Sequence, residues 1–334
     1  MAILVFLGWM AIFIKDLTLI ASKLSFQMMA FLQKKSGMAI ENKKDNEIGP
    51  CHYDGAVDKT ASYFFRREKL INFASMKRIL IIAAAVILLA GGCGSKDKVP
   101  TWAEEFNGNE IDWSVWSKIP RGTPHWQIHM SDCDDCFEMR DGCLVLKGIV
   151  NPGVEGDDSP LLTGGVWTHG KKSFGYGRLE ICARIGEAQG AWPALWMMPQ
   201  AGEPMLENEY GGEIDICEKL NFDDIAYQTL HTRFTLTDTT GHVHGASGPI
   251  KRNEFNVYAV EHYRDSIKLF INDTCTITYR RQPELGPLQW SFDKQFALYV
   301  DMQVGAPWPG EARLEDLPVE MEIDWIRFYE YPEE

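Results

Sequence analysis

The chain has 334 residues, 45% of them hydrophobic, and a formal net charge of −14. The charge is uneven: residues 1–92 hold 12 Lys and Arg against 7 Asp and Glu, so residues 93–334 carry −19. A body this acidic argues against nucleic acid and anionic membrane surfaces as partners and fits a neutral substrate. The length allows one large domain or two smaller ones, with enough apolar residues for a buried core.

The first hundred residues contain a segment with the layout of a secretory signal peptide. Met76-Lys77-Arg78 precedes a short apolar run, Ile79 to Ala90, and then Gly91-Gly92-Cys93. The run is too short to span a membrane as a helix. A cysteine directly after small residues resembles a bacterial lipoprotein cleavage site, although Ala90 is less usual at its position. We therefore expect a signal peptide over residues 76–92, lipidation of Cys93 and a polar tether over residues 93–100; the alternative is an anchoring helix in which Cys93 is incidental.

A signal peptide belongs at the start of a chain, yet this one follows 75 other residues. We interpret residues 1–75 as a doubtful extension from a start codon placed too early, with Met76 as the true start. The competing interpretation is that Ala2 to Ile14 anchors the protein, but Lys15 and Asp16 interrupt that run after 13 residues. The sequence predicts an exported bacterial lipoprotein on the outer membrane or cell surface, which contacts the membrane through its lipid anchor.

Residues 101–334 are predicted to form one all-β domain. Short strand candidates alternate with Gly, Pro, Asn and Asp, which is typical of a sandwich, and one domain of this length is ordinary for that class. A hairpin is expected over residues 137–146, turning at Asp141-Gly142. Further strands are expected at residues 164–167, 176–184, 190–198, 212–218, 257–263, 267–271, 296–303 and 321–329. The charges of residues 176–184 indicate a solvated face.

Three carboxylates lie in the segment Gly211-Gly212-Glu213-Ile214-Asp215-Ile216-Cys217-Glu218. Glu213 and Asp215 alternate with apolar residues at the period of a strand. Glu218 has an odd offset from both, which would place it on the opposite face of a regular strand. One extra residue, a β-bulge near Ile216-Cys217, would bring it back beside the other two acids. Taken alone, the segment is more typical of a solvated strand face.

The segments on either side decide between these interpretations. Trp192-Pro193-Ala194-Leu195-Trp196-Met197-Met198-Pro199 lies upstream and Tyr227-Gln228-Thr229-Leu230-His231-Thr232 lies downstream. A G-E-I-D-I-x-E segment after a W-P-A-x-W-M-x-P strand resembles glycoside hydrolase family 16, in its laminarinase-like, bulged branch. The resemblance covers about residues 101–331. It implies a concanavalin A-like β-jelly-roll sandwich with a concave substrate cleft.

The resemblance also implies the roles of the three acids. Glu213 would be the nucleophile, Glu218 the acid/base, and Asp215 a helper that hydrogen-bonds Glu213 and orients it. Retaining enzymes hold their two carboxyls about 5–5.5 Å apart, whereas five steps along a straight strand cover about 16 Å, so we infer that the bulge is required. Mutual repulsion is expected to raise one pKa, and Glu218 is the carboxyl that must stay protonated.

Other residues are candidates for binding substrate or metal. His231 could contact the acids or be a satisfied core histidine. Pyranose rings stack on aromatic faces, so Trp192, Trp196, Trp126 and Trp308 are candidate sugar platforms, with core packing as the alternative. Gln303 matches a family position that hydrogen-bonds sugar hydroxyls. Catalysis should need no cofactor; a structural Ca²⁺ is common in the family, and Glu105 and Asp324 lie at positions consistent with it, or are ordinary surface acids.

Six cysteines remain in the domain. Cys133 and Cys136 resemble half a zinc site, but no second C-x-x-C follows. A local disulfide with Cys143 nearby is the preferred interpretation, and an unpaired loop is the alternative. Cys182 and Cys217 lie in apolar strand contexts and are expected to be buried free thiols.

The leading functional hypothesis is a monomeric, retaining endo-β-glycosidase that cleaves β-1,3-glucan or mixed β-1,3/1,4-glucan. Two departures from common relatives border the expected cleft: Gly164-Gly165-Val166-Trp167 and Gly305-Ala306-Pro307-Trp308. They leave the reaction class intact but argue against plain laminarin cleavage. The alternative within enzymes is an endo-β-galactosidase acting on mucin-type or algal galactans. A carbohydrate-binding protein without catalysis is the alternative of another class, and a lectin would have no need of Glu213, Asp215 and Glu218.

Overall fold

The computed structural model describes residues 99–207 and 209–332. The predicted extension, the signal peptide and Cys93 lie outside the described residues, so the lipoprotein hypothesis stays a prediction. Among the residues that are described, no helix is both long enough and apolar enough to cross a membrane.

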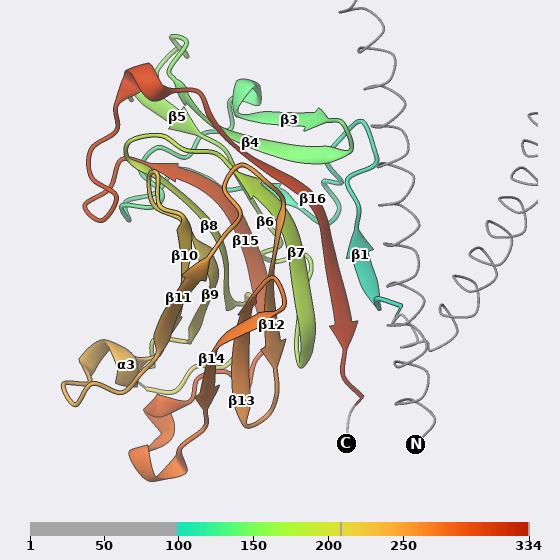
Figure 1. The fold of residues 1–334 in the computed structure, drawn as a ribbon, viewed down its shortest axis with the longest axis vertical. Helices are drawn as coiled ribbons and strands as arrows, with labels where there is room; N and C mark the ends of the chain where they lie inside the picture. The colour runs from blue at the N-terminus through green and yellow to red at the C-terminus, as the bar shows by residue number, and fades with distance from the viewer. Residues whose placement is uncertain (1–98, 208, 333–334) are drawn as a thin grey trace, which may run out of the picture. The chain divides into compact units, whose positions relative to one another are not determined.

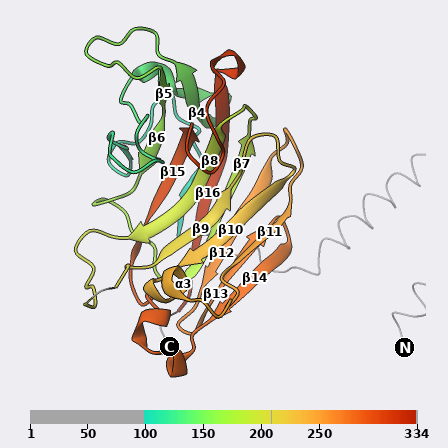
Figure 2. The same ribbon diagram turned by 90° about the vertical axis from the view of Figure 1, so that its left-hand side faces the viewer.

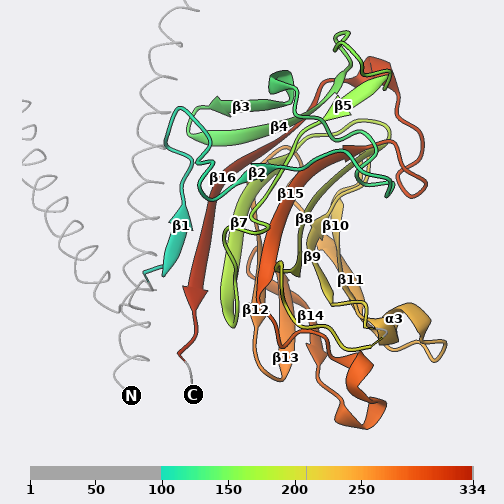
Figure 3. The same cartoon turned by 180° about the vertical axis from the view of Figure 1, so that it is seen from behind.

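The domain is built from two antiparallel sheets that face each other as curved layers (Figure 1). The larger sheet has nine strands. In spatial order its main path is β14 (Thr274–Arg280), β13 (Ser266–Ile271), β12 (Asn256–His262), β7 (Gly177–Ile185), β16 (Val319–Glu330), β4 (Cys143–Val150) and β3 (Phe137–Arg140). Two short strands complete it: β1 (Trp102–Glu104) pairs with β16, as Figure 3 shows, and β5 (Leu161–Thr163) pairs with β4.

The smaller sheet has seven strands and carries the three acids. Its order is β11 (Gly245–Pro249), β10 (Ile225–His231), β9 (Glu213–Glu218), β8 (Ala191–Pro199), β15 (Phe296–Val304), β6 (Gly165–Trp167) and β2 (Ser117–Lys118). Figure 2 looks onto this sheet, with β9 between β8 and β10. The arrangement is the β-jelly-roll sandwich that the resemblance implied.

Helical segments in the described residues are few and short. They are α3 (Arg233–Thr237), η1 (Asp134–Cys136), η2 (Pro283–Leu285), η3 (Pro287–Gln289) and η4 (Leu314–Asp316). A capping box stabilises the start of α3: the Thr232 side chain accepts from the Thr235 amide, and the Thr235 hydroxyl accepts from the Thr232 amide. This helix was not predicted, because five residues are too few to show a helical period.

The core lies between the two sheets and is filled by one face of each strand. Ile214 of β9, Leu195 and Met197 of β8, and Val300 and Met302 of β15 all point into it and are at most 4% exposed. Burying such side chains supplies most of the stability of the sandwich, about 1.5–3 kcal/mol for each one relative to full exposure. The opposite faces of the same strands are left to form the site.

The expected strands in the domain are confirmed; most ends differ by at most two residues, and β4 runs four residues beyond the expected end of the hairpin, to Val150. The hairpin turns at Asp141-Gly142 as predicted, with φ of 53° and 78° at these residues. The polar residues of β7 form ion pairs on the solvent side, such as Arg178 with Glu261 and Arg184 with Glu322, which confirms the solvated face. Strand β11 was missed because its sequence, Gly-Ala-Ser-Gly-Pro, has no strand signal of its own.

The prediction of a local disulfide is wrong. Cys133, Cys136 and Cys143 are all free thiols in the described structure. Cys136 ends η1 and is fully buried, whereas Cys143 begins β4, paired with Arg140. The two thiols therefore lie on different elements, Cys136 on η1 and Cys143 on β4. Burial also raises the pKa of the Cys136 thiol to about 12. Cys182 and Cys217 are buried free thiols, as predicted.

The entry into β9 depends on Gly212. Its φ is +82°, and a Cβ at this position would lie 2.8 Å from the carbonyl oxygen of Ser291. Gly153 has a similar φ of +94°, but a Cβ there would meet nothing within 4 Å. Substitution of Gly153 therefore measures the cost of a left-handed backbone alone, whereas substitution of Gly212 adds the cost of a close contact with Ser291.

We expect Gly153→Ala to lower the free energy of unfolding by about 1–2 kcal/mol, the cost of a left-handed conformation for an L-residue. Gly212→Ala should cost about 1–3 kcal/mol more, because the methyl group must also displace Ser291. Urea unfolding followed by tryptophan fluorescence measures both values. Equal losses in the two variants would contradict the close contact at Gly212.

Candidate active site

Strand β9 contains the predicted bulge, and its register shows where the bulge lies. On the β8 side, Leu195 pairs with Cys217 and Trp196 pairs with Asp215, so Ile216 is an extra residue. The side chains of Ile216 and Cys217 both pack into the core and are fully buried. Two successive inward residues restore the parity of the strand. Glu218 therefore lies on the same face as Asp215.

Glu213 stands at the start of β9 and is the most accessible of the three acids, with 18% of its side chain exposed. The hydroxyl of Tyr210 donates a hydrogen bond to its Oε2 at 2.8 Å. Its Oε1 lies 3.8 Å from Nε2 of His231, the residue opposite it on β10. One oxygen is thus held by a neutral donor, while the other faces the ring.

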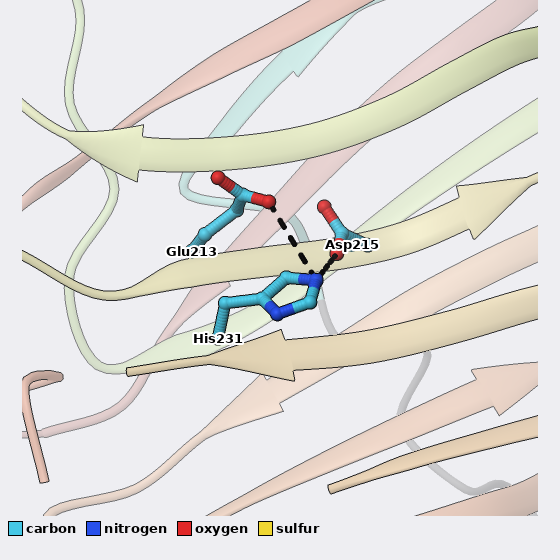
Figure 4. Close-up of side chains that lie close together, drawn as sticks. All are labelled: Glu213, Asp215 and His231. Atoms are coloured by element: carbon cyan, nitrogen blue, oxygen red, sulfur yellow. Dashed lines mark ion pairs between the residues drawn. The ribbon is translucent and has the colours of Figure 1, made fainter. Parts of the chain in front are cut away.

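Asp215 is buried beside the same histidine. Its Oδ2 lies 3.3 Å from Nε2 of His231, so the ring stands between the two carboxyls (Figure 4). Burial raises the pKa of Asp215 well above its usual range, and the charge of Glu213 raises it further. The hydrogen bond that we expected between Asp215 and Glu213 is not formed among the described residues. The structure places His231 as the link between them instead.

Glu218 is buried, with an exposed fraction of 8%. The indole N–H of Trp192 donates to its Oε1 at 2.9 Å. Burial, together with the charge of Asp215, raises the pKa of Glu218 to about 8, although the Trp192 hydrogen bond acts in the opposite direction. The carboxyl is therefore mainly protonated at neutral pH, which is the state that a general acid needs.

Aromatic side chains lie next to Glu218. Trp308 is 48% exposed, and its ring meets Trp192 edge-on at 5.5 Å and Tyr227 at 5.4 Å, measured between ring centroids. Tyr227 pairs directly with Glu218 across β10 and β9. A groove of about 500 Å³ continues from Tyr227 and Trp308 along residues 242–247. This groove offers an accessible aromatic surface on the Glu218 side of the site.

A second aromatic group is more deeply buried. Trp126 packs edge-on against Trp196 at 4.9 Å, and Trp196 packs against Tyr299 at 4.5 Å. Trp196 is only 7% exposed, and its N–H donates to Asp301 at 2.8 Å. The prediction of Trp196 as a sugar platform is therefore wrong, since its face is covered by other rings. Trp126 lies over it and is half-buried.

Gln303 is 4% exposed and hydrogen-bonds a further buried carboxyl, that of Asp301, which was not predicted as a site residue. Its amide donates to Asp301 at 2.6 Å, while its own Oε1 has no protein partner. Burial raises the pKa of Asp301 to about 7, and the hydrogen bonds from Trp196 and Gln303 act against that rise. A lone acid in the apolar run of β15 was the signal for Asp301. Tyr210 gave no such signal, because it lies in an irregular loop.

One of the two predicted calcium ligands, Glu105, is paired with an arginine. Both carboxylate oxygens of Glu105 accept hydrogen bonds from Arg327, at 2.8 and 2.9 Å. Within residues 99–207 and 209–332, the only cluster of three potential ligands is Glu213, Asp215 and His231. A cation at Glu105 would have to displace the guanidinium, and the expectation of a structural calcium ion at Glu105 and Asp324 stays a prediction. No step below depends on a metal.

The family model of glycosyl hydrolases family 16 matches residues 157–327, a range that includes every strand around the three acids. The chain belongs to this family. A family 16 chain is a glycoside hydrolase, and its reaction retains the configuration of the anomeric carbon.

Similar proteins carry several specificities. The keratan-sulfate endo-1,4-beta-galactosidase of Sphingobacterium multivorum is 31% identical over 251 residues, which are 75% of this family 16 chain and 59% of that protein. The beta-glucanase of Rhodothermus marinus is 34% identical over 293 residues, covering 79% of this chain and 98% of that protein. A solved structure from work on endo-acting O-glycanases of the human gut microbiota, which initiate mucin breakdown, has a TM-score of 0.60 and 25% identity. It covers 70% of this chain and 100% of its own.

We expect Trp192→Phe to move the basic limb of the pH profile of kcat/KM upward. The indole N–H stabilises the ionised form of Glu218, so its loss raises the pKa of the free enzyme's acid. A hydrogen bond of about 0.5–1.5 kcal/mol corresponds to about 0.4–1 pH unit.

Trp308→Phe is the matched control, because Trp308 contacts the Trp192 ring and makes no hydrogen bond to Glu218 in the described structure. That variant should leave the basic limb in place, even if KM changes. A downward shift in Trp192→Phe, or equal shifts in both variants, would contradict this account of Glu218.

Proposed function

We propose that this chain is an endo-acting β-glycoside hydrolase that cleaves β-1,3-glucan or mixed β-1,3/1,4-glucan. The observation that carries the proposal is the bulged strand β9, which brings Glu213, Asp215 and Glu218 to one face of the sheet. Only Glu218 and Asp215 of the three are deeply buried. The site therefore combines an accessible carboxylate with a neutral carboxyl, which is the division of labour that glycoside cleavage requires.

In the first step, Glu213 attacks the anomeric carbon and the bond to the leaving oxygen breaks. Glu218 gives its proton to that oxygen, so the departing sugar leaves as an alcohol. In the second step, Glu218, now ionised, removes a proton from water, and the oxygen of that water displaces Glu213 from the anomeric carbon. Glu218 ends protonated and Glu213 ionised, as they began. Two inversions at one carbon give net retention.

The neighbours of Glu213 support its role as the nucleophile. Tyr210 donates to Oε2, which leaves Oε1 without a hydrogen bond in the described structure. His231 stands 3.8 Å from Oε1 and 3.3 Å from Asp215. We infer that His231 and Asp215 together orient Glu213, in place of the direct contact that we expected. Neither residue has to exchange a proton with the substrate.

Charge favours a neutral glucan over an anionic galactan. Residues 93–334 carry −19, so a sulfated or sialylated glycan would be repelled at low ionic strength. The Rhodothermus relative named a beta-glucanase matches this chain over 98% of its own length. The galactanase alternative rests on the Sphingobacterium relative, named for keratan sulfate, of which the chain spans 59%. The exposed Trp308 provides a platform for a pyranose in either case.

The substrate proposal predicts a ranking of polysaccharides. Laminarin and lichenan should be cut within the chain to give short oligosaccharides, and agarose, keratan sulfate and mucin glycans should be cut at least ten-fold more slowly. Mass spectrometry of the products at matched enzyme concentration measures both rate and chain length. Faster release from keratan sulfate or mucin would replace the glucan by the galactan proposal. Binding without products from any of the five would support the carbohydrate-binding alternative.

The assignment of the two glutamates predicts opposite azide products. Glu218→Ala should lose most activity on polysaccharide, by about 10²–10⁴-fold, the usual contribution of a general acid. On an aryl glycoside whose leaving group needs no proton, the first step should survive. Added azide should then attack the glycosyl-enzyme and give a β-azide.

Glu213→Ala should fail on every substrate without azide, because the nucleophile is gone. With azide it should give the α-azide by a single displacement. Proton NMR of the anomeric signal distinguishes the two products. If the anomers are exchanged between the two variants, the assigned roles are reversed.

A further inference from the structure

A glutamine lies buried beneath the bulge, on the core side of the strand next to β9. Gln228 belongs to β10 and is fully buried. It faces the bulge directly, because Tyr227 pairs with Glu218 and Thr229 pairs with Asp215, which leaves Gln228 alone opposite Ile216 and Cys217. Its Nε2 donates to the carbonyl oxygen of Ile216 at 2.6 Å. Ile216 is the extra residue of the bulge.

The same side chain reaches across to the opposite sheet. Its Nε2 also donates to the carbonyl of Phe270 in β13 at 3.2 Å, and its Oε1 accepts from the hydroxyl of Thr276 in β14. Two carbonyl groups at one end and a hydroxyl at the other fix the orientation of the amide, since only the NH₂ end can serve both carbonyls. The buried amide therefore has a partner for each of its N–H groups and for its oxygen.

Thr276 lies at a second bulge. Leu269 pairs with Ile277 and Phe270 pairs with Cys275, so Thr276 is the extra residue of β14. Its hydroxyl also lies 3.1 Å from the carbonyl of Leu269. The side chain of Gln228 thus hydrogen-bonds both bulge residues, Ile216 of β9 in the smaller sheet and Thr276 of β14 in the larger sheet. A regular strand in either sheet would not present these groups at this point.

We propose that Gln228 is a positioning residue for catalysis, which holds the bulge of β9 and thereby sets the position of Glu218 relative to Glu213. The inference rests on the proposed function and assigns to it a residue that does not touch substrate. The register of β9 explains why the bulge sets the position of Glu218 and not that of the other two acids. On the other side of the bulge, Glu213, Ile214 and Asp215 keep regular pairing with β10, whereas Glu218 follows the extra residue.

The proposal predicts a loss that depends on the leaving group. Gln228→Met has a similar volume but no donor for Ile216. It should lower kcat/KM on the polysaccharide about 10- to 100-fold, the effect expected when a catalytic group is misplaced by about 1 Å. For a dinitrophenyl β-glycoside of a short oligosaccharide, kcat/KM reports a first step that needs no proton from Glu218. On that substrate the variant should stay within about three-fold of the wild type.

The matched control is Thr276→Val, which removes the hydroxyl from the same network and leaves the Gln228–Ile216 hydrogen bond in place. It should lower the unfolding midpoint while keeping the wild-type ratio of the two kcat/KM values. If Gln228→Met does not fold, Gln228→Glu is used, because it keeps the shape and, as a buried neutral carboxyl, one donor. For Gln228→Glu, the ratio of kcat/KM on the aryl glycoside to kcat/KM on the polysaccharide should then rise, but by less than the ten-fold expected for Gln228→Met.

The outcomes separate the inference from the proposed function. Wild-type protein that cleaves neither substrate class, glucan or galactan, overturns the proposed function and the inference with it. If the wild type is active, two results overturn the inference alone. The first is an equal loss of kcat/KM on both substrates in Gln228→Met. The second, if Gln228→Glu is used instead, is a wild-type ratio of the two kcat/KM values in that variant. The inference also fails if Thr276→Val changes the ratio of the two kcat/KM values as much as the Gln228 variant does. The change of ratio would then follow from lost stability rather than from the Gln228–Ile216 hydrogen bond.

Discussion

The parity of a β-strand is the constraint on which the site depends. Side chains alternate between the two faces, so Glu213 and Glu218, five residues apart, belong to opposite faces of any regular strand. The protein resolves this by turning two successive side chains, Ile216 and Cys217, into the core. The core must accept both, and the carbonyl of the extra residue must find a donor inside the sandwich. A catalytic requirement on the concave face is thus met by packing and hydrogen bonding on the other face.

Burial then divides the acids by protonation state. Asp215 and Glu218 lie on β9 and Asp301 lies on β15, two strands away in the same sheet, and burial raises the pKa of each. Uncharged donors hydrogen-bond two of them, Trp192 for Glu218 and Trp196 with Gln303 for Asp301, whereas Asp215 has Nε2 of His231 at 3.3 Å. No Lys or Arg makes an ion pair with any of them in the described structure. An arginine beside Glu218 would hold it ionised and remove the proton that the leaving group needs.

Much of the fold and part of the site could be predicted from the sequence. Alternation marked the long strands, and the odd offset of Glu218 was enough to predict the bulge at Ile216 and Cys217. The exposure of the tryptophans could not be predicted, because Trp192 and Trp196 have the same period and differ only in what covers them: Trp196 lies under Trp126. The local disulfide predicted among Cys133, Cys136 and Cys143 was wrong, because cysteines that are close along the chain need not lie on elements that face each other. The role of Gln228 could not be found, because two of its three side-chain partners come from strands more than 40 residues away and the third is a backbone carbonyl.

The connection between the two bulges bears on how a sandwich can hold a precise site. Each bulge alone is a weak point, because it interrupts the ladder and leaves polar groups without regular partners. Placed opposite each other, the two supply one another's missing partners through the side chain of Gln228 and the hydroxyl of Thr276. Slippage of β9 by one residue would break hydrogen bonds in both sheets at once, and an unpaired buried polar group costs about 1–3 kcal/mol. The larger sheet, which carries none of the three acids, therefore adds to the stability of the register on which the position of Glu218 depends.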